Sequence, residues 1–520
     1  MVRGSKVVSQ GARQGDGSSG SPAGRYARGT VPLSRERSGV ANPSAKITLM
    51  YLIRVIGVYE DTIAAVATPL GEAGVGIIKI SGAQAETIAR RVVKRKDYEG
   101  VAWKEWQSHR MYLGYVYEGA AEEIVDEVLF CCMRAPRTYT KEDVVEINCH
   151  GGLVSLRKTL ELVLAAGARM AEPGEFSKRA FLNGRLDLAQ AEAVIDLVRS
   201  KTEKGLSMAV SQLRGRLSAK IRELQEGILA LLAAIEVEND FPEEGPEEQK
   251  TEKWLLLGEE LIAGLEELIN DAQKGIIYRE GVKAAIIGRP NVGKSSLFNA
   301  LLRQGRAIVT EIPGTTRDTI EERVNIKGIP VAFIDTAGLR ETRDKVEMIG
   351  VQRTREVVDR SDLVLVVFDA AKPLDLAERE IIETVTGKKL VMVINKTDLG
   401  DPDDLVKEVR GLAVDVPVVA VSALTGDGIE KLEERISEKL TFSDNSFDQE
   451  LLISNTRHRR AVTRAKEHLE EARLGLNSGI PVDIAAIDIR SAWEALGEIT
   501  GAVVTEDLLD RIFSDFCVGK

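Results

Sequence analysis

The stretch Gly288-Arg289-Pro290-Asn291-Val292-Gly293-Lys294-Ser295 decides the fold, because it fits the phosphate-binding pattern GxxxxGKS. It directly follows the apolar run 284–287, which is typical of a buried strand. A glycine-rich turn between a strand and a helix presents backbone N–H groups to phosphate oxygens at the positive end of the helix. In such a turn Lys294 reaches the outer phosphates and the hydroxyl of Ser295 binds Mg²⁺. The other expected loop contacts are Asn291, Val292, Gly293 and Ser296.

Two further motifs surround the expected position of the γ-phosphate. Asp335-Thr336-Ala337-Gly338 follows the apolar run 331–334, which places the Asp335 carboxylate beside the metal and the Gly338 N–H near the γ-phosphate. Gly314-Thr315-Thr316-Arg317-Asp318 lies between this motif and the phosphate loop, and Thr316 can offer Mg²⁺ a second hydroxyl. The groups expected to act on the γ-phosphate are Lys294, Thr316, Asp335 and Gly338.

Two more motifs indicate a guanine pocket. Asn395-Lys396-Thr397-Asp398 follows the apolar run 390–394, and an Asp in that position accepts two hydrogen bonds that guanine donates and adenine cannot. Ser422-Ala423-Leu424 follows the run 418–421 and would complete the base pocket. All the motifs occur in the order that a GTPase requires, so we predict a P-loop GTPase domain.

One expected group is missing from this domain. Many small GTPases place a glutamine directly after DxxG to orient the attacking water, whereas this chain has Leu339. Another group must therefore orient the water, and another charge must offset the γ-phosphate. The side chain of Asn291 can bind a monovalent cation such as K⁺, with further oxygens from Thr310, Ile312 and Thr315. Asn291 can equally be an amide that only stabilises the loop, because Asn is common in turns.

Length and composition limit the remaining possibilities. The 520 residues correspond to roughly three to four domains at ~150 residues each. The net charge of −11 argues against a broad basic surface for nucleic acid. The four cysteines lack CxxC spacing, and Cys131 and Cys132 are adjacent, which indicates neither a zinc site nor a disulfide framework. No apolar run approaches the ~18 residues of a membrane span, so we expect a soluble, cytoplasmic protein.

The region before the GTPase domain divides into three parts. Residues 1–49 are rich in Gly, Ser and Arg with only two acids, and we expect them to be disordered. They are either an extended start before Met50 or an organellar transit peptide. Residues 50–183 are predicted to form an α+β domain, with strands at 62–66, 76–80, 125–132 and 144–148 and a helix at 153–166.

Residues 184–280 are predicted to be helical. Apolar residues recur every three or four positions from Val210 to Ile235, which predicts one long helix, and 254–269 predicts a second. Helical patterns return in 443–520, after the expected GTPase domain at 281–442. The simplest organisation is one helical domain interrupted by an inserted GTPase domain. The alternative is two separate helical linkers.

At this point the chain resembles the MnmE family, also called TrmE, of tRNA-modification GTPases, over about residues 55–520. Besides the GTPase motifs, the resemblance rests on DTIAAVATP at 61–69, HGG at 150–152, PGEFS at 173–177, RAFLN at 179–183, LDLAQAEA at 186–193 and RIFSDFCVGK at 511–520. These segments lie in all the predicted domains other than the first 49 residues.

The resemblance implies a homodimer built through the N-terminal domains, which bind 5-formyltetrahydrofolate or a related tetrahydrofolate. It also implies a flavoprotein partner of the MnmG type, FAD-dependent, with which the complex adds an aminomethyl or carboxymethylaminomethyl group to C5 of the wobble uridine in certain tRNAs. By the same likeness the GTPase domains dimerise around K⁺, and Glu347 orients the water indirectly. The positions that correspond to folate contacts are Lys79, Glu146, Arg185 and Lys520.

Three points stay open. Lys79 stands where the family leads us to expect arginine, so a point charge replaces the planar guanidinium that contacts a carboxylate bidentately. Cys517 is either a catalytic thiol or a structural one. The basic run 457–460 is either a tRNA contact or a solvated helix face. A function of another class, a ribosome-assembly or regulatory GTPase switch without modification chemistry, is the alternative to the tRNA-modifying enzyme.

Overall fold

The structure is a computed structural model that describes residues 61–95, 105–119, 123–240, 247–304, 322–334, 350–385, 387–413, 415–441 and 452–520. Several predictions made above fall outside these ranges. They concern the first 49 residues and the site positions Thr310, Ile312, Thr315, Thr316, Asp335, Gly338 and Glu347.

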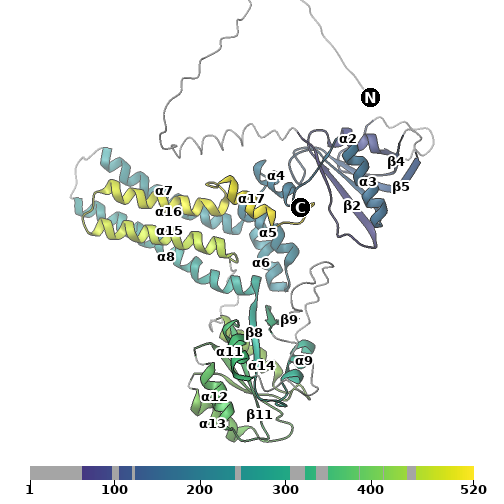
Figure 1. The fold of residues 1–520 in the computed structure, drawn as a ribbon. Coiled ribbons are helices and arrows are strands. Elements are labelled where there is room, and N and C mark those ends of the chain that lie inside the picture. Colours follow the sequence, from purple (N-terminus) through teal and green to yellow (C-terminus); the bar gives the residue numbers. More distant parts are fainter. Residues whose placement is uncertain are drawn as a thin grey trace, which may run out of the picture. The chain divides into compact units, whose positions relative to one another are not determined.

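The N-terminal described region is built on a sheet with strand order β3-β4-β5-β6-β2-β1-β7. All neighbours are antiparallel except β1 and β7, which are parallel. The strands are β1 (Ile63–Val66), β2 (Ala73–Ser81), β3 (Val93–Arg95), β4 (Arg110–Glu118), β5 (Glu123–Met133), β6 (Val144–Gly151) and β7 (Arg169–Met170). Helices α2 (Ala85–Val92) and α3 (Leu153–Ala165) share an apolar core with this sheet (Figure 1). The predicted strands and helix of this region are confirmed.

A helical bundle contains segments from both ends of the central domain. Helices α7 (Arg216–Asp240), α8 (Glu247–Glu280), α15 (Thr456–Asn477) and α16 (Val482–Thr500) lie side by side and share one apolar cluster (Figure 1). Around them the chain forms α4 (Glu175–Leu182), α5 (Leu188–Arg199), α6 (Glu203–Leu213) and α17 (Glu506–Ser514). Because helices from before and after the GTPase motifs bury the same core, the helical region is one unit interrupted by an insertion.

The prediction of one continuous helix from 210 to 235 is wrong. Helix α6 ends at Leu213 and α7 begins at Arg216, with Gly215 between them at φ 83°. This left-handed conformation favours glycine and ends a helix. The Gln190 side chain donates to the Leu213 carbonyl across 3.0 Å and so satisfies one of the free groups at the end of α6. The apolar spacing continues through the break, so periodicity alone could not detect it.

The inserted domain has a sheet of order β13-β12-β11-β8-β10-β9. Only β9 is antiparallel to its neighbour. The strands are β8 (Val282–Ile287), β9 (Glu322–Ile326), β10 (Ile329–Phe333), β11 (Leu363–Asp369), β12 (Lys389–Asn395) and β13 (Val418–Ala420). Each strand expected from an apolar run is present, and their carboxyl ends meet at one edge, where ligands bind in such sheets.

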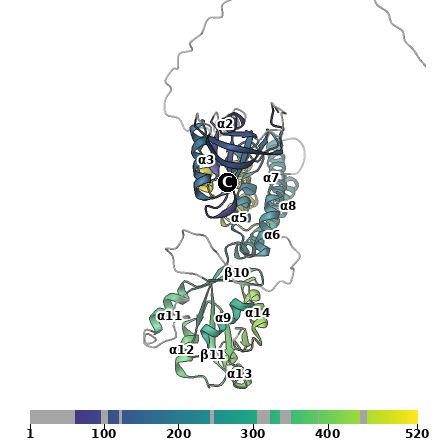
Figure 2. The ribbon, with the colours of Figure 1, turned by 90° about the vertical axis from the view of Figure 1, so that its right-hand side faces the viewer.

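Helices cover both faces of this sheet (Figure 2). Helices α9 (Lys294–Gln304) and α14 (Ile429–Thr441) pack in one apolar cluster. Helices α11 (Gly350–Asp359), α12 (Leu376–Thr384) and α13 (Asp403–Leu412) pack in the cluster on the other face. The chain therefore has the predicted multidomain fold, with an α+β region, a helical region and an α/β P-loop domain. In the described residues, no helix is both long enough and apolar enough to cross a bilayer.

Candidate functional site

The phosphate loop connects β8 to α9 and adopts a strained backbone. Gly288 has φ 149°, Asn291 has φ 64° and Gly293 has φ 97°. A Cβ atom on Gly293 would lie 2.2 Å from the Nδ2 atom of Asn395, so only glycine allows these segments to approach. Lys294 begins α9, and its ammonium donates to the carbonyl oxygens of Gly288 and Arg289, both at 2.9 Å. Lys294 thus lies against the loop, as the predicted phosphate cradle requires.

The predicted base-recognition motif, residues 395–398, is hydrogen-bonded to this loop. Asn395, at the end of β12, donates through Nδ2 to the Val292 carbonyl at 2.9 Å and accepts at Oδ1 from the Ala423 N–H at 3.0 Å. Lys396 donates to the Asn291 carbonyl at 2.6 Å. One amide side chain therefore joins the ends of β8, β12 and β13, which fixes the predicted phosphate and base contacts relative to each other.

Asp369 is a site residue that the sequence analysis missed. It lies at the end of β11, and its carboxylate accepts from the Lys396 ammonium at 2.8 Å. Burial would raise the pKa of Asp369, but the hydrogen bonds from Lys396 and from the Ala371 N–H outweigh burial and hold this pKa below its ordinary value. An ionised Asp369 fixes Lys396 beside the loop. The signal available in the sequence was a carboxylate ending an apolar run, as in the other motifs.

A hydrogen bond from the Ser422 hydroxyl orients Asp398, the predicted guanine contact. Ser422 donates from Oγ to Oδ1 of Asp398 at 2.6 Å, and Oγ also accepts from the Thr425 N–H at 3.2 Å. Asp398 is exposed, and Leu424 of the second predicted base motif is 83% exposed. An oriented carboxylate at the open end of the sheet can accept the paired N–H groups of guanine. Ser295 and Ser296 follow Lys294 in the first turn of α9 and are half-buried and exposed, respectively.

Lys79 connects the four positions expected to contact folate: it shares the Tyr139 ring with Arg185, lies opposite Glu146, and feels the charge of Lys520. Lys79 on β2 is directly opposite Glu146 on β6. The Lys79 ammonium is 5.4 Å from the ring centroid of Tyr139, and the Arg185 guanidinium carbon is 4.7 Å from the same centroid. Burial lowers the pKa of Lys79, opposed by the charge of Glu146 and reinforced by that of Lys520. The structure thus brings together residues far apart in the sequence.

Two aromatic residues of this cluster were missed. Tyr139 donates to or accepts from the Ser177 hydroxyl at 2.7 Å, and burial raises the pKa of its phenol, so the ring is held in place and stays uncharged. Phe176 is fully buried with its ring centroid 5.3 Å from the Lys79 ammonium. A flat aromatic surface beside a carboxylate and three cations suits a heteroaromatic ring that carries an acidic tail.

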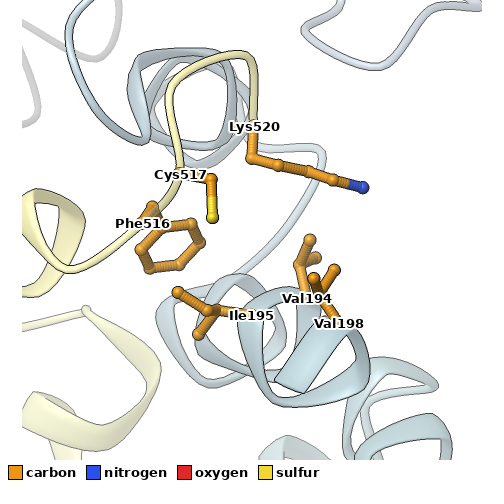
Figure 3. Close-up of a pocket in the computed structure, with 6 residues that line it drawn as sticks. All are labelled: Val194, Ile195, Val198, Phe516, Cys517 and Lys520. Atoms are coloured by element: carbon orange, nitrogen blue, oxygen red, sulfur yellow. The ribbon is translucent and has the colours of Figure 1, made fainter. Parts of the chain in front are cut away.

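Cys517 lies close to this cluster, in the C-terminal tail. The tail residues Phe516, Cys517 and Lys520 line a small pocket with Val194, Ile195 and Val198 of α5 (Figure 3). The Cys517 carbonyl accepts from the Gly174 N–H at 3.4 Å, and a Cβ on Gly519 would lie 2.4 Å from the Val66 carbonyl oxygen. The tail is therefore packed against the N-terminal region, while the Cys517 residue is exposed.

The interpretation of the basic run 457–460 as a surface feature is wrong for its first two residues. His458 is fully buried, and its Nε2 lies 2.6 Å from an oxygen of Glu192. Arg457 donates to both oxygens of the same carboxylate, at 2.9 and 2.6 Å. Arg457 neutralises this buried acid and His458 is hydrogen-bonded to it, so neither side chain is available to RNA.

Comparison with known proteins gives matches in each region. A family model described as the GTP-binding protein TrmE N-terminus matches residues 62–185, and the MnmE helical domain matches residues 188–517. A protein of Desulforamulus reducens named tRNA modification GTPase MnmE is 49% identical over 467 residues, 89% of this chain and 100% of that protein. A protein of the same name from Geobacillus kaustophilus is 48% identical over 461 residues, 88% of this chain and 99% of that protein.

Among solved structures, the G domain of FeoB from Methanococcus jannaschii is similar to 31% of this chain. It is 28% identical, 97% of that chain is covered, and the TM-score is 0.22.

Proposed function

This chain belongs to the MnmE family of tRNA-modification GTPases, and from that membership we propose that it modifies the wobble uridine of certain tRNAs. With an MnmG-type flavoprotein it adds an aminomethyl or carboxymethylaminomethyl group at C5 and hydrolyses GTP in the process. The observation that carries this proposal is the extent of the match, 89% of this chain and all of a relative named for tRNA modification. The reaction places the protein in the compartment that holds its tRNA, which we propose is the cytoplasm.

In the nucleotide site, Lys294 binds the outer phosphates and Ser295 and Thr316 hold Mg²⁺, which supplies positive charge to the phosphate oxygens. Ser295 fits this role because it lies in the first turn of α9, directly after Lys294. Asp335 and Gly338 complete the γ-phosphate site, and Glu347 orients the attacking water. Asp398, already held by Ser422, selects guanine.

K⁺ supplies the charge that an arginine finger provides in other GTPases. Asn291 supports this role, because among the described residues its side-chain amide makes no hydrogen bond, while its carbonyl is held by Lys396. Asn291 is also exposed to solvent. Thr310, Ile312 and Thr315 supply the other oxygens in this proposal. Two GTPase domains close on each other around the ion, within a homodimer formed by the N-terminal domains.

A tetrahydrofolate binds at the cluster around Tyr139. Glu146 accepts from the N–H edge of the pterin, and Lys79, Arg185 and Lys520 bind the glutamate tail. The aromatic ring with cations near it supports this assignment. Cys517 shares the C-terminal tail with Lys520, and its exposed thiol is the reactive group that we assign to the modification site.

Folate binding distinguishes this function from that of a ribosome-assembly or regulatory GTPase switch, which has no use for a pterin. Titration of the full chain with 5-formyltetrahydrofolate, followed by calorimetry, should give saturable binding. Binding of GTP without any binding of the folate would favour the regulatory switch.

A further inference from the structure

Helix α5 lies where the chain enters and leaves the inserted domain. Helix α8 ends at Glu280, with Gly281 alone between it and β8, and α15 begins at Thr456 after the domain. These two segments are close together, because the Thr456 hydroxyl donates to the Glu280 carboxylate at 3.5 Å. In the preceding turn of α8, a Cβ atom on Gly275 would lie 1.9 Å from the Ile453 carbonyl oxygen. We call Arg279 and Glu280 the incoming segment, and residues 453–458 the returning segment.

The returning segment is held by Glu192 of α5. Its carboxylate accepts from Arg457 and His458 as described above, and the Asn455 side chain donates to it at 3.3 Å. The Glu192 residue is 5% exposed. The buried Gln212 side chain lies 3.3 Å from His458 Nδ1 and completes this cluster. A carboxylate enclosed in this way strongly resists separation from its partners, because an uncompensated buried charge would remain.

The incoming segment is held by Asp196, one helical turn further along α5. Arg279 donates from Nε to Oδ1 of Asp196 at 2.8 Å, and Asp196 is 8% exposed. Residues four apart in a helix lie on the same face, so Glu192 and Asp196 present a pair of carboxylates to the two segments. Movement of either segment must therefore displace α5 or break a buried ion pair.

A different part of α5 contacts the C-terminal tail. Val194, Ile195 and Val198 line the pocket that Phe516, Cys517 and Lys520 close (Figure 3). The Arg199 guanidinium donates to the Asp515 carbonyl oxygen at 2.6 Å. One helix of twelve residues is thus in contact with both segments that carry the GTPase domain and with the tail that bears the exposed thiol.

We propose that α5 couples the nucleotide state of the GTPase domain to the C-terminal tail, with Glu192 and Asp196 as the positioning residues. When nucleotide binding or hydrolysis displaces the incoming and returning segments, the two buried carboxylates move α5, and α5 moves the tail. The proposal rests on the proposed function only in assigning the modification site to that tail. The coupling itself is measurable without tRNA or the flavoprotein.

The test uses the reactivity of Cys517 in the full chain. Its thiol is the exposed one of the four cysteines, while burial raises the pKa of Cys132 to about 12 and that of Cys149 to about 11. The wild type is labelled with a thiol reagent, once in the presence of GDP and once in the presence of a non-hydrolysable GTP analogue, and the two labelling rates are compared. Cys517→Ser gives the background labelling. We expect the labelling rate to differ by about fivefold or more, in the range usual for allosteric coupling.

The informative variant is the double substitution Asp196→Asn with Arg279→Gln, which replaces the ion pair by a neutral pair of similar size that folded proteins tolerate. We expect unchanged GTP affinity and turnover, and a nucleotide effect on labelling below about twofold, because neutral hydrogen bonds are roughly half as strong. The matched control Glu266→Gln removes the negative charge from a partly exposed pair with Lys466 between α8 and α15 and should retain the full effect.

The proposal would be overturned if the folded double variant kept the effect of the nucleotide on the labelling rate. It would also be overturned if the wild type were labelled at the same rate with either nucleotide. Circular dichroism and thermal unfolding establish that the double variant is folded. Should the double variant not fold, Arg279→Lys keeps the positive charge but loses the planar guanidinium, and a full nucleotide effect in it would likewise overturn the proposal. If labelling responds as expected but tRNA is not modified, the proposed function fails and the coupling stands.

Discussion

The Nδ2 atom of Asn395 donates to the carbonyl oxygen of Val292 at 2.9 Å, so the last residue of β12 holds the phosphate loop that follows β8. Both partners are buried, at 1% and 2% exposure. The residue that begins the predicted base-recognition motif therefore also holds the predicted phosphate loop.

The substitution Asn395→Ala should weaken the binding of GDP and of GTP alike, by about 10- to 100-fold. It leaves the Val292 carbonyl and the Ala423 N–H without their hydrogen-bond partner. Asn395→Asp should be as harmful, since a carboxylate cannot donate to the carbonyl. Titration with a fluorescent guanine nucleotide measures the effect. Asn477→Ala, at the exposed end of α15, is the control and should bind as the wild type does. Wild-type affinity in Asn395→Asp would show that the hydrogen bond to Val292 is dispensable.

Replacing K⁺ by Na⁺ at matched ionic strength should slow GTP hydrolysis by about 10-fold or more, because the smaller ion fits a site of protein and phosphate oxygens less well. Asn291→Ala should remove the difference between the two salts while GDP affinity stays close to that of the wild type. Steady-state phosphate release provides the measurement. Equal rates in both salts for the wild type would remove the cation role from Asn291.

Lys79→Met should weaken binding of 5-formyltetrahydrofolate by about 10-fold, the effect of losing one charge-assisted contact in a partly buried site. Lys79→Arg should bind at least as tightly as the wild type, because a planar fork can contact a carboxylate bidentately. Lys158→Met, which loses only an exposed pair with Glu118, serves as the control. Unchanged affinity in Lys79→Met would place the folate elsewhere.

The buried cluster around Glu192 should make stability depend on pH. Burial would raise the pKa of Glu192, but His458 and Arg457 lower it from 4.5 to about 2, so its contribution is present above pH 4.5 and is lost as the pH falls toward 2. Burial lowers the pKa of His458 from 6.5 despite the adjacent Glu192, so its contribution is complete above pH 6.5 and is lost below it. Both shifts destabilise the fold as acid is added.

Thermal unfolding between about pH 8 and about pH 5 tests this dependence. We expect a constant midpoint in the upper part of the range and a falling one below pH 6.5. In His458→Gln the unfolding midpoint should be lower than that of the wild type at every pH. It should begin to fall only near pH 4.5, where Glu192 starts to lose its contribution. A wild-type midpoint that rises on acidification would contradict the neutral, buried His458.

The sequence predicted those features that depend on neighbouring residues. Apolar runs followed by polar motifs located the strands of the P-loop domain, because each run is a local pattern. The base pocket at the Asp398 motif stays a prediction. Asp369 and Tyr139 were missed since their roles arise from contacts across the fold. Arg457 looked like part of a basic surface because the sequence gives no sign that its partner carboxylate lies 265 positions away. The break at Gly215 was hidden because the apolar spacing continues through it.

The most direct measurement is nucleoside analysis of tRNA from a strain that lacks its own member of this family and is complemented with this chain, with a matching flavoprotein present. We expect the modified wobble uridine to return with the wild type and to stay absent with Asp398→Ala, whose nucleotide pocket has lost its guanine contact. Bulk tRNA that keeps an unmodified wobble uridine, although the chain is expressed and hydrolyses GTP, would contradict a role in tRNA modification.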